Sequence, residues 1–298
     1  MRKILFTLLF LCILIPVNAQ NGIEKILQEV EANNTTLQAL QKQVEAQKLG
    51  NKTGIWLPNP EITFGRLWGT PPEIGNQNDF GITQSFDFPT VYAHRNKLAG
   101  MENQNIDRLY QSERINTLLR AKQVIIELAY NNALSEDYTR RMEIAQTITD
   151  SYQKKFDLGE VNAIERNKVY MNLISCISKK EKIDIARQAL LNELKSLNGG
   201  KEIQFNETDI PITPLPSDFN EWYAATESKS PALQYLSKQV DISKQQVKLR
   251  RAEGLPKLSA GYASERILGE KLQGVVIGIS IPLWENKNSV KQAKAEVL

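Results

Sequence analysis

Residues 152–170 read YQKKFDLGEVNAIERNKVY, and this stretch decides the fold because it reverses a very long helix. Gly159 can adopt the left-handed conformation that ends a helix. Asn162 and Glu165 have the spacing of a reciprocal capping box, in which each side chain caps the backbone of the other. We therefore predict a helical hairpin whose turn covers Leu158 to Ala163.

The helix before this turn is predicted to be unusually long. From Thr90 to Asp157 the chain has no proline, and after Gly100 it has no glycine, which permits a helix of roughly 100 Å at 1.5 Å per residue. An apolar stripe recurs along it at steps of three and four residues, which predicts a partner helix. The stripe consists of Tyr130, Leu134, Tyr138, Met142, Ala145, Ile148, Tyr152 and Phe156.

The returning helix is predicted from Ala163 to about Leu197, where Asn198, Gly199 and Gly200 end it. It covers only about half of the long helix. A first helix over residues 23–53 could cover the other half if it is stacked end to end with the returning one.

An internal repeat organises the chain. The segment LQALQKQV at 37–44 returns as LQYLSKQV at 233–240, with six of eight residues identical. Leu57-Pro58 and Gly81-Ile82-Thr83 return in the same order as Leu255-Pro256 and Gly278-Ile279-Ser280. We divide the chain into a first repeat (20–200), an irregular link (201–230) and a shortened second repeat (231–298).

Each repeat changes period after its Leu-Pro pair, from a helical pattern to strict alternation. In the first repeat Ile62, Phe64 and Trp68 are followed by an alternation of apolar and small or polar residues from Asp79 to Phe88, and the segments 258–262 and 274–283 repeat the pattern. Strands of about ten residues with one apolar and one polar face are typical of membrane strands around a wet lumen. The stretch 69–78 is predicted to be an exposed loop and 267–271 a shorter turn.

The amino-terminal residues indicate export. Arg2 and Lys3 precede an apolar run from Ile4 to Val17 that ends at a small-residue cleavage site, so residues 1–19 are predicted to be a signal peptide. Cys12 lies within that run, which leaves Cys176 as the one cysteine of the mature chain and excludes an internal disulfide.

Charge and composition argue against several classes of function. The formal net charge is only +3, with acids and bases interspersed, so nothing favours a nucleic-acid partner. The single histidine, His94, has no paired carboxylate or cysteine beside it, and Asp79 and Asp87 are expected in a wet pore. We predict neither an enzyme nor a cofactor or metal site.

The order of signal peptide, helix, two strands, very long helical hairpin, link and the same order again resembles the TolC family of outer-membrane efflux proteins. The segment FGITQSFDFP at 80–89, with Arg95, is similar to the heavy-metal cation-efflux branch of that family. The resemblance implies a mainly helical fold with transmembrane strands. In that family three subunits each give four strands to one barrel in the outer membrane of a Gram-negative bacterium, and the helices extend into the periplasm.

The same resemblance implies passive export of small solutes or metal cations, with a homotrimer, outer-membrane lipid, a periplasmic adaptor and an inner-membrane pump as partners. The hairpin tip would dock on the adaptor through Leu158, Gly159, Glu160, Val161, Asn162 and Ala163. The pore would be lined by Asp79, Gly81, Thr83, Ser85, Asp87, Gly274, Gly278 and Ser280. Helix capping alone would also account for Gly159 and Asn162, and ordinary strand alternation for Thr83 and Ser85.

The chain departs from the family pattern because Leu298 corresponds to about position 101 of the first repeat. The second hairpin, which supplies most of the entrance constriction in the family, is therefore expected to be missing. Two alternatives stay open: a periplasmic coiled-coil adaptor with a soluble β domain, and a truncated remnant that does not conduct. Exported substrate and pump partner are not encoded in any motif.

Overall fold

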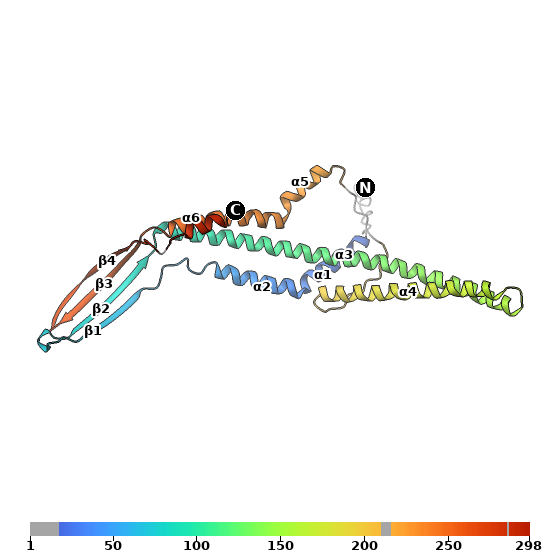
Figure 1. Ribbon diagram of the computed structural model, residues 1–298, viewed down its shortest axis with the longest axis horizontal. Helices are drawn as coiled ribbons and strands as arrows, with labels where there is room; N and C mark the ends of the chain where they lie inside the picture. The colour runs from blue at the N-terminus through green and yellow to red at the C-terminus, as the bar shows by residue number, and fades with distance from the viewer. Residues whose placement is uncertain (1–17, 210–215, 285) are drawn as a thin grey trace, which may run out of the picture. The chain divides into compact units, whose positions relative to one another are not determined.

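The computed structural model describes residues 18–209, 216–284 and 286–298 (Figure 1). Most of the predicted signal peptide, with Cys12, and two prolines of the predicted link, Pro211 and Pro214, lie outside the described residues. The chain divides into two compact units, one of residues 1–39 and 113–217, the other of residues 40–112 and 218–298. Within the described residues, no helix combines the length and the apolar character needed to cross a membrane.

The predicted hairpin forms the body of the first unit. Helix α3 (Pro89–Asp157) is one continuous helix of 69 residues, as expected, and its residues from 113 onward belong to this unit. Helix α4 (Ala163–Leu197) returns beside it. The capping box is present: Asn162 Oδ1 accepts from the Glu165 amide at 2.9 Å, and Glu165 Oε2 accepts from the Asn162 amide at 3.1 Å. Gly159 has a φ of +74°, which confirms the helix-ending conformation.

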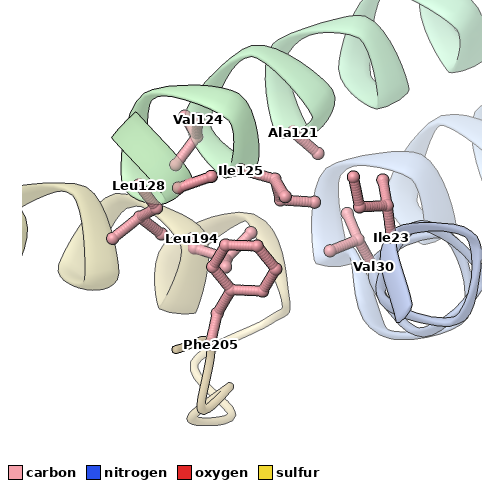
Figure 2. Packing of buried hydrophobic residues seen from close by; sticks show 9 residues of the cluster. Ile23, Val30, Ala121, Val124, Ile125, Leu128, Leu194 and Phe205 are labelled. Carbon is pink, nitrogen blue, oxygen red and sulfur yellow. The ribbon is translucent and has the colours of Figure 1, made fainter. Parts of the chain in front are cut away.

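The core of this unit lies where three helices meet (Figure 2). Helix α1 (Asn18–Asn33) packs against α3 and the last turn of α4, and the loop after α4 adds Phe205. Removing these apolar side chains from water is the main stabilising term for such a small contact region. The buried residues are Ile23, Val30, Ala121, Val124, Ile125, Leu128, Ala129, Leu194 and Phe205.

The first helix is not continuous as predicted. It is divided at Asn34 into α1 and α2 (Thr35–Gly50). The Asn34 side chain is buried, donates to the carbonyl of Leu197 at 2.8 Å and accepts from the amide of Leu37 at 2.9 Å. An asparagine side chain can replace backbone partners in this way, so the helix ends and restarts although no proline or glycine marks the position.

The second unit contains one four-stranded sheet in the order β1-β2-β3-β4, with every neighbouring pair antiparallel (Figure 1). The strands are β1 (Glu61–Leu67), β2 (Gln77–Phe86), β3 (Lys257–Ile267) and β4 (Glu270–Ser280). The β1–β2 connection contains a short 3-10 helix, η1 (Pro72–Ile74). Leu268 and Gly269 join β3 to β4 with φ of 47° and 93°, as a tight two-residue hairpin requires.

Helices α6 (Pro231–Ala252) and α7 (Ser289–Ala295) complete the second unit together with parts of α2 and α3. A small core of Val91, Leu249 and Ala252, with Leu98 packed against it, joins α3 to the end of α6.

The prediction that residues 201–230 form an irregular link is partly wrong, because this segment contains helix α5 (Phe219–Lys229). Asp218 caps this helix by accepting from the amides of Asn220 and Glu221. No proline lies between residues 217 and 230, so a helix is permitted there. The prediction missed it because prolines flank that stretch on both sides.

Candidate functional site

The strand register gives the sheet two chemically different faces. Residues that lie directly opposite each other on antiparallel strands project to the same face. The apolar face joins Ile62, Ile82, Tyr262 and Val275 in one row and Phe86, Leu258 and Ile279 in another. The polar face joins Thr63, Gly81, Ala263 and Gly274 in one row and Ser85, Ser259 and Gly278 in another.

No described segment of the chain covers the apolar face. Phe64, Val275 and Ile277 are 74%, 78% and 81% exposed, and Ile62 and Ile279 are also largely exposed. A contiguous apolar surface of this kind on a folded protein marks contact with a membrane or a partner.

Seven of the eight predicted pore residues share the polar face. These are Asp79, Gly81, Thr83 and Ser85 from β2 and Gly274, Gly278 and Ser280 from β4. The two sets come from different repeats, and pairing of β2 with β3 brings them into one sheet. Gly261 lies between them on β3, and the β-carbon of any side chain there would lie 2.5 Å from the carbonyl oxygen of Ile82. A residue without a side chain is therefore required at this point of the polar face.

Asp87, the eighth predicted pore residue, lies just beyond β2 and belongs to an ion-pair cluster. Its carboxylate accepts from Arg95 Nη1 at 2.7 Å, and Arg95 Nη2 lies 3.4 Å from Glu253. Glu253 also pairs with Arg250 at 2.9 Å, and its carbonyl accepts from the Asn286 side chain at 2.7 Å. The cluster therefore ties the end of β2, the start of α3, the end of α6 and the segment after β4 together.

This cluster lines an open depression of about 900 Å³ where the strands give way to helices. Sequence reasoning singled out Asp87 and Arg95 but missed Glu253, which is 158 residues from Arg95 and carries no local signal. Neighbouring His94 is satisfied by the amide of Gln245, with 3.0 Å between Nδ1 and Nε2. That pairing favours a structural histidine over a catalytic one.

The hairpin tip is accessible. Leu158 and Ile164 are 74% and 80% exposed, and of the six predicted docking residues only Val161 is half-buried. The guanidinium of Arg166 lies 4.3 Å from the centre of the Phe156 ring, which braces the two helices next to the turn. The tip is thus a capped turn that presents the exposed side chains of Leu158 and Ile164.

No cluster of three or more His, Cys, Asp or Glu side chains that could hold a metal ion occurs among the residues described. Cys176 is a free, half-buried thiol on α4. Neither observation adds a binding centre to the sheet, the ion-pair cluster or the tip.

Together, the single two-faced sheet and the very long helical hairpin define the fold of TolC-family outer-membrane channels, and solved structures match it over most of the chain at low identity. The CmeC outer membrane channel of Campylobacter jejuni matches with a TM-score of 0.70 at 17% identity, over 92% of this chain. The transmembrane channel protein CusC gives 0.75 at 14% identity over 93%, and the outer membrane protein VceC of Vibrio cholerae gives 0.73 at 12% identity over 93%.

The matches confirm the predicted fold class, with long helices and four antiparallel strands. The chain spans 65% of the length of CmeC, 70% of CusC and 73% of VceC. No family model matches the sequence, and no curated protein matches it either.

Proposed function

We propose that the chain is a subunit of an outer-membrane efflux channel, in which the four strands cross the membrane and the helices extend into the periplasm. The observation that carries the proposal is the two-faced sheet. Its exposed Phe64, Val275 and Ile277 side chains suit lipid, and its Thr83, Ser85 and glycine face suits a wet passage.

The sheet edges support assembly from several copies. In the part of the chain that the structure describes, strands β1 and β4 each pair on one side only, which leaves a row of backbone donors and acceptors on the other. Because the strands alternate in direction, β4 of one copy can pair antiparallel with β1 of the next. We propose a homotrimer of this kind, as the resemblance to the TolC family implies.

Transport through this assembly would be passive. An inner-membrane pump would supply the energy, and a periplasmic adaptor would dock at the hairpin tip, where Leu158 and Ile164 are exposed. Heavy-metal cations or small organic solutes would be the cargo, with no catalysis and no resident cofactor. A soluble β domain, as an adaptor would have, suits the sheet less well, because its apolar face has no cover within the described residues.

The membrane placement is tested with two adjacent cysteine variants, Thr83→Cys and Ile82→Cys, in a Cys176→Ser background. The two side chains lie on opposite faces of β2. In outer-membrane vesicles a charged, water-soluble maleimide should label position 83 and leave position 82 unlabelled until detergent is added. Equal labelling of both positions in intact vesicles would refute the placement of the sheet in the membrane.

Adaptor docking is tested by Leu158→Asp in cross-linking to the adaptor encoded with the pump of the same cell. Ile185→Asp is the matched control, because Ile185 is 70% exposed on α4 and distant from the tip along the helix. The first variant should lose the cross-linked product while keeping outer-membrane sorting, and the control should retain both. Retained cross-linking by Leu158→Asp would remove the tip from the docking site.

A further inference from the structure

A row of basic side chains borders the apolar face at the end of the sheet where β1 connects to β2 and β3 connects to β4. The strand register forms one row across the sheet, in which each residue lies opposite the next: Arg66 of β1, Asn78 of β2, Arg266 of β3 and Lys271 of β4. All three cations are exposed, and they share the face of Phe64 and Phe80 in the next row.

Charge is sorted between the two faces at this end. The nearby acids Asp79, Glu265 and Glu270 occupy register positions of the polar face. Among residues 18–209, 216–284 and 286–298, no acid lies within ion-pair distance of Arg66, Arg266 or Lys271. The ion pairs of the described residues therefore do not explain these three cations.

The arrangement is unfavourable without an external anion. Arg266 and Lys271 are direct cross-strand partners, and like charges in that position destabilise a sheet. Arg66 stands three strands from Lys271, or about 14 Å at an interstrand spacing of about 4.8 Å. The row is thus wide enough to face more than one anionic group.

We propose that this row binds the phosphate groups of membrane lipid head groups at the membrane surface nearest the hairpin turns. The inference rests on the proposed membrane placement of the strands. A lipid fits better than a free anion because the row borders the exposed Ile62, Phe64 and Val275 side chains, which suit acyl chains. Exposed Trp68, directly after β1, suits the same interfacial depth.

The test uses the full chain and vesicles of zwitterionic phosphatidylcholine, with or without one fifth of an anionic phospholipid or of a phosphorylated glycolipid. The variant is Arg266→Gln with Lys271→Gln. The control is Lys244→Gln with Lys248→Gln, which removes the same charge from two exposed positions of α6. Circular dichroism verifies that both variants keep their helix and strand content.

The native chain should bind the anionic vesicles more tightly than the zwitterionic ones. Each basic side chain near an anionic surface contributes about fivefold in affinity, so the double variant should bind anionic vesicles about 25-fold more weakly, with little change on zwitterionic vesicles. The control should stay within about twofold of the native chain on both.

Three other outcomes would overturn the inference, and they separate it from the proposed function. Equal binding to both kinds of vesicle would refute the head-group site but would still agree with the membrane placement of the strands. Binding to neither kind of vesicle would refute the head-group site and the membrane placement. A site for lipid head groups should keep its anionic preference when about 20 mM inorganic phosphate is added at constant ionic strength. Loss of the preference under that condition would assign the row to free phosphate instead.

Discussion

Replacing Gly199 by alanine should destabilise the first unit far more than the same change at Gly200. Both glycines have positive φ, of 65° and 85°, so alanine at either position carries the left-handed penalty of about 1–2 kcal/mol. Their surroundings differ: a β-carbon at Gly200 meets no atom within 4 Å, whereas one at Gly199 would overlap the carbonyl oxygen of Asn33.

The extra cost of Gly199→Ala comes from moving the end of α1 away from the end of α4. That movement disrupts the bond from Asn33 Nδ2 to Asn198 Oδ1 at 3.0 Å and the bond from Asn34 Nδ2 to the Leu197 carbonyl at 2.8 Å. Each contributes about 1 kcal/mol net. We expect a total of about 3–4 kcal/mol for Gly199→Ala against about 1–2 kcal/mol for Gly200→Ala.

The assay is urea denaturation of the full chain in detergent, followed by circular dichroism at the helix band. Gly159→Ala serves as a second control, since Gly159 has a φ of +74° and no neighbour within 4 Å of a β-carbon. If all three variants lose the same stability, the close approach of Asn33 to Gly199 is absent in solution and the reasoning is refuted.

Three further predictions concern single side chains. Leu194→Ala, which empties a fully buried position, should cost about 2–5 kcal/mol in the same urea titration, whereas Leu158→Ala at an exposed position should cost under about 0.5 kcal/mol. Asn162→Ala should cost about 1 kcal/mol and Asn162→Asp much less, because aspartate still accepts from the Glu165 amide; equal losses would deny the capping role. Burial raises the pKa of Glu102 above its usual value, so its unfavourable effect on stability develops as pH rises from the usual carboxyl pKa to the raised one and is complete above it. Glu102→Gln should therefore stabilise the chain at pH 8 and leave its stability unchanged below about pH 4, and a constant difference between the two pH values would contradict this.

Much of the fold was predictable from the sequence because its signals are local. The absence of proline and glycine from 101 to 157, the Gly159 turn and the Asn162–Glu165 box each act within a few residues, and α3, the turn and α4 follow them closely. Alternation after Leu57-Pro58 and Leu255-Pro256 likewise predicted the strands and the residues that share each face. The docking role of the tip and the pore role of the polar face stay predictions.

What only the tertiary structure decided depends on residues distant in sequence. The break between α1 and α2 at Asn34 involves the Leu197 carbonyl, and the ion-pair cluster of Asp87 involves Arg95 and Glu253. A local sequence pattern does not identify these partners. The basic row needs the register of all four strands, because Arg66, Arg266 and Lys271 are unremarkable one by one. Local propensity thus determined most of the helices and strands, whereas cross-strand pairing and long-range hydrogen bonds determined the break at Asn34 and which side chains meet.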